Sequence, residues 1–160
     1  MTRSRSVSLG LGLLVVGCAR EVGDERCDVE ALVRARAEPG AVDCGLATAG
    51  AGEDAVHACV VEAFRDGRAF YGLVQTPAVG SVLVRAWVGA SGVSGGAGEV
   101  ELVLADFDGC DDSTCRGAVQ ALPCPGATVG LVDGREQVTC GWDTPPCGVR
   151  LCGADPGCGG

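Results

Sequence analysis

The chain has 160 residues, 11 cysteines, a single histidine and a formal net charge of −9. Residues 18–160 are numerous enough to bury one hydrophobic core, so a single domain is expected. Such an acidic chain repels the phosphates of nucleic acids and of anionic lipid headgroups, which excludes both as preferred partners.

The start of the chain has the pattern of an export signal. Arg3 and Arg5 precede a short apolar run from Leu9 to Val16, and positive charge stays on the cytoplasmic side during export. The run is far shorter than the roughly 20 apolar residues that span a bilayer, so it predicts a targeting segment rather than a transmembrane helix. Small Gly17 then precedes Cys18.

The segment Val15-Val16-Gly17-Cys18 resembles the lipobox of bacterial prolipoproteins, with valine in place of the usual leucine. The resemblance implies a signal peptide over 1–17, an acylated Cys18 and a lipidated tether over 18–26. Two or more acyl chains anchor a protein stably. Because Ala19 rather than aspartate follows Cys18, the resemblance also implies the outer membrane of the cell envelope. The alternative is an ordinary secretory signal, with Cys18 incidental.

The other ten cysteines are even in number, which in an exported chain predicts five disulfides. Sequence alone does not fix their connectivity. The favoured pairs are Cys44–Cys59, Cys110–Cys115, Cys124–Cys140, Cys147–Cys152 and Cys27–Cys158. The alternative is a zinc site, but the chain has no Cys-x-x-Cys and His57 is its only histidine.

Two helices are predicted in the first half of the chain. Asp24 caps the first, which runs to about Ala37 and is stopped by Pro39-Gly40. The second begins at Glu53 and ends at Arg65-Asp66-Gly67. Its apolar stripe recurs at helical spacing over Val56, Cys59, Val60, Ala63 and Phe64.

Strands follow over Phe70–Thr76, Ser81–Gly89 and Glu99–Phe107, with a hairpin loop over Ala90–Gly98. The expected cross-strand pairs are Val88 with Val100, Ala86 with Leu102 and Val84 with Leu104, which places Arg85 diagonal to Glu101. Two weaker strands, Ala127–Val132 and Arg135–Trp142, are joined by the tight-turn pair Asp133-Gly134.

The order of these elements predicts an α+β fold, with one or two N-terminal helices packed on one face of an antiparallel sheet and a disulfide-stapled C-terminal extension. Residues 27–160 form one disulfide-rich domain, in which 145–160 is an irregular tail rich in Cys, Gly and Pro. Asp43-Cys44-Gly45 and the segment Phe64–Phe70 resemble uncharacterised disulfide-rich lipoproteins of high-GC, myxobacterial-type genomes. That resemblance covers about residues 40–110 and implies no catalytic residues.

An acidic loop is one candidate site. Asp106, Asp108, Asp111 and Asp112 are hard oxygen ligands of the kind that Ca²⁺ prefers, although the spacing is not that of an EF-hand. The alternative is a solvated turn held by Cys110–Cys115.

Residues 92–96 match Gly-x-Ser-x-Gly, with Ser94 as nucleophile and His57 as the only available base. A nucleophile elbow lies between a strand and a helix, whereas Ser94 lies between two predicted strands, so a hydrolase is the least favoured function.

The third candidate is a sheet face that carries Leu83, Arg85 and Trp87, since Trp and Arg are enriched at binding hot spots. The alternative is that Trp87 packs under the second helix or the Cys-rich tail. The favoured function is a non-catalytic binding module on the envelope, with a membrane lipid anchor, no cofactor, and a protein or glycan partner. A structural or calcium-stabilised envelope component is the alternative.

Overall fold

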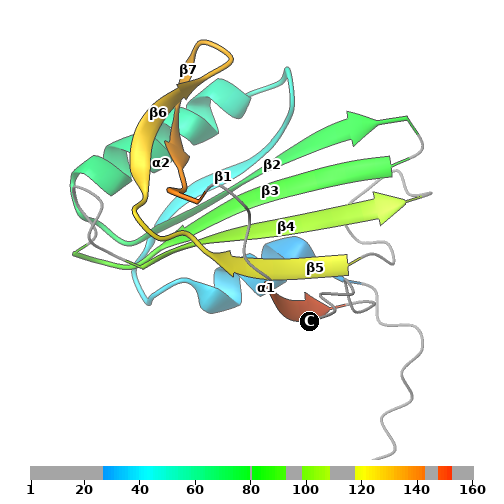
Figure 1. Cartoon of the computed structure of the whole chain (residues 1–160), viewed down its shortest axis with the longest axis horizontal. Coiled ribbons are helices and arrows are strands. Elements are labelled where there is room, and N and C mark those ends of the chain that lie inside the picture. The colour runs from blue at the N-terminus through cyan, green and yellow to red at the C-terminus, as the bar shows by residue number, and fades with distance from the viewer. Residues whose placement is uncertain (1–26, 80, 93–98, 109–117, 143–147, 153–160) are drawn as a thin grey trace, which may run out of the picture.

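The computed structural model describes residues 27–79, 81–92, 99–108, 118–142 and 148–152 (Figure 1). In chain order they form α1 (Val29–Arg36), β1 (Val42–Thr48), α2 (Glu53–Arg65), β2 (Phe70–Ala78), β3 (Ser81–Gly89), β4 (Val100–Asp108), β5 (Ala118–Pro123), β6 (Thr128–Val132), β7 (Arg135–Thr139) and β8 (Val149–Cys152). Neither helix in this part of the chain is long and apolar enough to cross a bilayer.

Six strands form one sheet in the order β1-β2-β3-β4-β5-β8, and β6 pairs with β7 in a separate two-stranded sheet. All neighbours are antiparallel except β1 and β2, which are parallel. Parallel neighbours need a crossover connection, and α2 supplies it. The predicted α+β class, with helices on a mostly antiparallel sheet, is confirmed. The prediction that the helices share one face is wrong, because α1 packs on one face of the sheet and α2 on the other.

Three strands were not expected from the sequence. β1 has an irregular register between Asp43 and Leu46, which interrupts the alternation that would reveal a strand. β5 follows the acidic loop. β8 lies within residues 145–160, so the prediction that this whole tail is irregular is wrong for Val149–Cys152.

The two helices differ in how well the sequence predicts them. α2 spans Glu53–Arg65, as its apolar stripe indicates. α1 is shorter than expected, because its N-cap is Asp28 rather than Asp24. The Asp28 Oδ1 accepts a hydrogen bond from the Ala31 amide at 2.9 Å, which satisfies one of the free amides in the first turn.

β3 and β4 pair one residue away from the predicted register. Gly89 lies opposite Val100, and Trp87 lies opposite Leu102. A shift of one residue exchanges the two faces of a strand. Glu101 therefore lies opposite Val88, on the α1 side of the sheet, where it pairs with Arg36 and not with Arg85.

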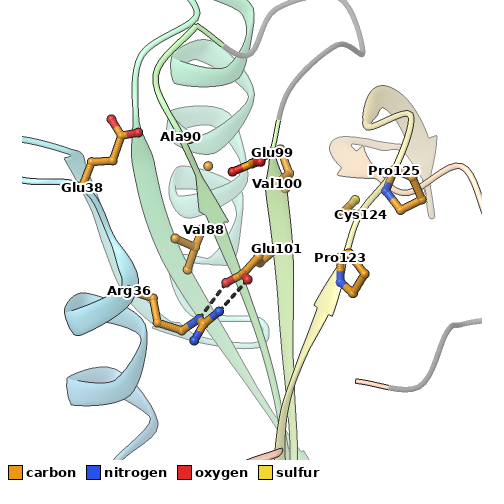
Figure 2. A pocket seen from close by; sticks show the side chains of 11 residues that line it. Arg36, Glu38, Val88, Ala90, Glu99, Val100, Glu101, Pro123, Cys124 and Pro125 are labelled. Atoms are coloured by element: carbon orange, nitrogen blue, oxygen red, sulfur yellow. Dashed lines mark hydrogen bonds and ion pairs between the residues drawn. The ribbon is translucent and has the colours of Figure 1, made fainter. Parts of the chain in front are cut away.

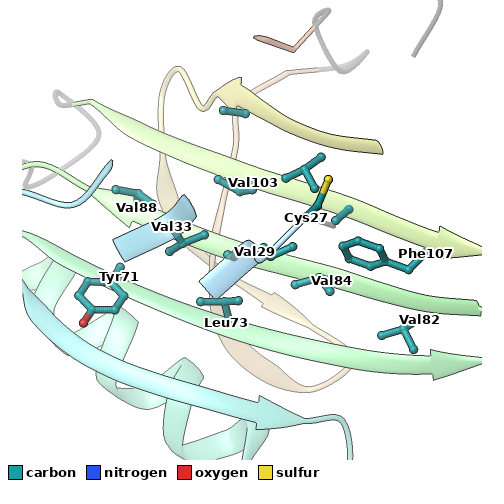
Figure 3. Packing of buried hydrophobic residues seen from close by; sticks show 14 residues of the cluster. Cys27, Val29, Val33, Tyr71, Leu73, Val82, Val84, Val88, Val103 and Phe107 are labelled. Carbon is teal, nitrogen blue, oxygen red and sulfur yellow. The ribbon is translucent and has the colours of Figure 1, made fainter. Parts of the chain in front are cut away.

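α1 covers one face of the sheet through Val29 and Val33, which are fully buried. Beneath them lie apolar side chains from the central strands, among them Leu73, Val84, Val103 and Phe107 (Figure 3). Burying a valine side chain contributes roughly 1.5–3 kcal/mol. Two such residues hold this two-turn helix on the sheet.

α2 and the β6–β7 hairpin cover part of the opposite face. Val60 and Phe64 on α2, Phe70 on β2, Trp87 on β3 and Val138 on β7 belong to this second core. The hairpin turns at Asp133 and Gly134, whose φ angles are 51° and 79°. Two positive φ values are typical of the type I′ turn that Asp-Gly favours, so the predicted hairpin is confirmed.

Three disulfides join described residues. Cys44–Cys59 and Cys124–Cys140 confirm two predicted pairs. Cys27 pairs with Cys152 across 125 residues of sequence, so the predicted pairs Cys27–Cys158 and Cys147–Cys152 are wrong. β8 brings Cys152 beside the start of α1, a placement that loop length could not reveal. The predicted Cys110–Cys115 bridge, like the signal segment with Cys18, lies outside the described residues.

Candidate functional site

The face of the sheet that carries α2 is only partly covered. Trp87 and Leu102, opposite each other on β3 and β4, pack in the core under α2 and the hairpin. The next row along β3 is Arg85, opposite Val74 on β2 and Leu104 on β4. Figure 1 shows β2, β3 and β4 running on past the hairpin. The outer part of this face therefore lies beside the hairpin and is not covered by it.

A cleft of about 560 Å³ lies over this part of the face. We call it the hairpin cleft. Its floor includes Val74, Leu83, Arg85 and Leu104, and its wall includes His57 on α2 and Arg135 on β7. A volume of this size lies within the range typical of pockets for small ligands, roughly 300–1,000 Å³.

Ion pairs hold the hairpin against α2 and so shape the wall. The Arg135 Nε lies 2.7 Å from Asp54 Oδ1, and its guanidinium also contacts the nearly buried carboxylate of Glu53. The Arg65 Nη2 lies 2.6 Å from Glu136 Oε1. Exposed pairs contribute little stability individually. Their role here is to position the hairpin, because they hold β7 against α2.

His57 is one of the buried polar groups of the wall. Its side chain is in the first half of α2, 6% exposed, and its ring meets the Trp87 ring edge-on with centroids 5.0 Å apart. The Nδ1 atom is buried without a hydrogen-bond partner in the described part of the chain. Burial lowers the pKa of His57, and the nearby Arg135 and Arg85 lower it further, against the opposing effect of Glu53 and Asp54.

Arg85 differs from the other described arginines. It is exposed on the floor of the cleft, and no ion pair links it to a described carboxylate. Each of the others whose side chain is described lies within salt-bridge distance of at least one carboxylate: Arg34, Arg36, Arg65, Arg68 and Arg135. A chain with more acidic than basic residues thus leaves this guanidinium available to a ligand.

The predicted face of Leu83, Arg85 and Trp87 does lie on one side of β3, and all three residues line the cleft. Trp87, however, is only 1% exposed, since α2 and the hairpin cover it. The interpretation that Trp87 packs under the second helix is therefore confirmed, and Trp87 does not belong to an exposed patch. Leu83, at 44% exposure, and Arg85 remain accessible.

A second hollow, of about 580 Å³, lies where α1 ends near the β3–β4 connection (Figure 2). Two of its charged groups, Arg36 and Glu101, bind each other. Arg36 donates from Nε and Nη2 to the two carboxylate oxygens of Glu101 at 2.6 and 2.5 Å, and Glu38 accepts from the Ser91 amide at 3.2 Å. Because its guanidinium is already paired, this hollow is less suited to a charged ligand than the hairpin cleft.

The other predicted sites are only partly within the described residues. Asp106 is exposed and lines the hairpin cleft, whereas the side chain of Asp108 and all of Asp111, Asp112 and Ser94 lie outside. Over the described ranges, no group of three or more His, Cys, Asp or Glu side chains could hold a metal ion.

In comparisons with known proteins, no family model, no curated protein and no solved structure matches this chain. The chemistry of the site must therefore be argued from its own geometry. The hairpin cleft combines an unpaired guanidinium, a buried imidazole and apolar floor residues. These groups can bind a ligand through charge, hydrogen bonds and apolar contact together.

Proposed function

We propose that this chain is a lipid-anchored protein of the bacterial cell envelope, attached through Cys18 and acting as a non-catalytic binding module. Its partner is an envelope protein or glycan that enters the hairpin cleft. The lipobox-like segment Val15–Cys18 and the even number of remaining cysteines support the anchor and the exported setting.

The observation that carries the binding role is the hairpin cleft itself. A partly open sheet floor meets a wall that ion pairs hold in place, and Leu83 and Arg85 are accessible on that floor. Arginine contributes strongly at binding surfaces because its guanidinium makes several directed hydrogen bonds.

Site-specific photo-crosslinking in intact membranes tests this function. A photoreactive residue at Leu83 should give a discrete crosslinked product. The matched control is Val149, which is 65% exposed and pairs with Ala121, a residue of the core on the α1 side. We expect a product from Leu83 and none from Val149. Equal products from both positions, or none from Leu83, would contradict the proposed site.

The anchor is tested separately by mass spectrometry of the mature protein from membranes. We expect an N-terminal Cys18 that carries acyl chains. A chain that begins at any other residue would disprove the lipoprotein assignment.

A further inference from the structure

We propose that the hairpin cleft takes a ligand with a single carboxylate joined to an apolar group, such as the C-terminal end of a peptide. The carboxylate binds the Arg85 guanidinium, and the apolar group lies against Leu83 and Leu104. This inference rests on the binding role proposed above and names the chemistry that the cleft recognises.

Arg85 makes no ion pair with a described carboxylate, which leaves its guanidinium free to bind a ligand. The other arginines whose side chains are described each lie within salt-bridge distance of a carboxylate. Arg85 has Asp106 in the neighbouring cross-strand row of the same face, since Asp106 pairs with Leu83, yet the two are not within salt-bridge distance. A guanidinium without a carboxylate partner keeps its fork of donors free for a ligand, and that fork matches a carboxylate in two parallel hydrogen bonds.

His57 is a second group that favours an anion in the cleft. Its Nδ1 is buried and unpartnered, which costs stability unless a partner arrives. The imidazole lines the same cleft as Arg85. A ligand anion between or beside them would interact favourably with both groups.

The charges around the cleft favour a singly charged anion. Asp106 and Asp133 also line the cleft, and the chain as a whole carries a net charge of −9. A doubly charged phosphate would meet more repulsion than a monoanion. The Arg135 guanidinium is already held by Glu53 and Asp54. One available guanidinium beside apolar Leu83 and Leu104 therefore favours a monocarboxylate with an apolar neighbour.

The test uses the single histidine as a reporter in the full mature chain. N-acetyl-alanyl-leucine is titrated while the imidazole signals of His57 are followed by NMR, and the C-terminal amide of the same dipeptide is the matched control. The free acid should shift the signals saturably and raise the pKa of His57, because a bound negative charge favours the imidazolium form. The amide should bind at least tenfold more weakly.

A variant of Arg85 and a control variant test whether Arg85 binds the carboxylate. Arg85→Met should weaken binding of the acid at least tenfold, whereas Arg68→Met, on another surface, should leave it unchanged. Equal binding of acid and amide, tighter binding of phenyl phosphate, or no saturable shift would overturn the proposal. If Arg85→Met does not fold, the comparison of acid with amide on the wild-type chain still decides. If the dipeptide acid does not bind but Leu83 still gives a crosslinked product, this ligand class is rejected and the proposed binding role stands.

Discussion

The indole Nε1 of Trp87 donates a hydrogen bond to the carbonyl oxygen of Val138 at 3.1 Å, which joins β3 to β7. Trp87 is the largest fully buried side chain of the domain's described part. It lies at the boundary where the covered part of the sheet ends and the floor of the hairpin cleft begins. This contact therefore positions the hairpin that forms the wall of the cleft.

Replacing Trp87 with phenylalanine should lower the free energy of unfolding by about 2–3 kcal/mol, because it removes buried atoms and leaves the Val138 carbonyl without its donor. Trp142→Phe is the control, since Trp142 is only half-buried. Urea denaturation of the oxidised protein measures both. Similar losses for the two variants would show that the Trp87 contact has no special role.

The stability of the fold should fall as the pH is lowered below about 6.5, the ordinary pKa of histidine. Burial, aided by Arg135 and Arg85, lowers the pKa of His57 in the folded state. The unfolded chain therefore binds more protons in this range, and the free energy of unfolding decreases until the pH falls through the folded-state pKa. His57→Gln should flatten this dependence between pH 7 and pH 5. If the free energy of unfolding of this variant depends on pH as steeply as that of the wild type, groups other than His57 cause the dependence.

Gly89→Ala should destabilise the protein by about 1–3 kcal/mol through overpacking. A methyl group at Gly89 would overlap the ring of Phe70, the residue opposite it on β2. Phe70→Leu removes the far end of that ring. In thermal denaturation, the double variant should lose less stability than the sum of the two single variants. If the two stability losses add strictly, Gly89 and Phe70 do not contact each other as the structure indicates.

The Cys27–Cys152 disulfide should contribute more stability than Cys124–Cys140. The two bridges close sequence separations of 125 and 16 residues, for which the chain-entropy model gives about 4–5 and about 3 kcal/mol. Double alanine variants of each pair, compared in urea, measure the difference.

Peptide mapping under non-reducing conditions checks the pairing itself. Cleavage after Arg150 and before Asp155 separates Cys152 from Cys147 and Cys158. Cys27 should be recovered in a disulfide with the fragment that holds Cys152. Recovery with Cys158 would contradict the position of β8.

Local features of the fold could be predicted from the sequence. The apolar stripe of α2, the Asp133-Gly134 turn and the disulfides Cys44–Cys59 and Cys124–Cys140 each depend on residues close in sequence. The register between β3 and β4 could not be predicted from the sequence. Both faces of this sheet bury apolar side chains, so Val103 on one face of β4 and Leu102 on the other satisfy alternation equally well.

The candidate site was predictable only in part. The alternation of β3 places Leu83 and Arg85 on one face, and the structure retains both on the floor of the cleft. The wall depends on contacts between distant segments, since Arg135 meets Glu53 across 82 residues of sequence. No local pattern encodes that contact. The unpaired state of Arg85 likewise emerges only when the partners of the other arginines are known.

The role of Arg85 in partner binding is measured by the yield of crosslinked product from Leu83 in intact membranes when Arg85 is changed. With Arg85→Met the yield should fall at least tenfold, because the guanidinium that holds the partner is lost. With Arg68→Met, an exposed arginine paired with Glu62 and Asp66, the yield should stay at the wild-type level. Equal yields from the two variants would contradict the assignment of the hairpin cleft as the binding site.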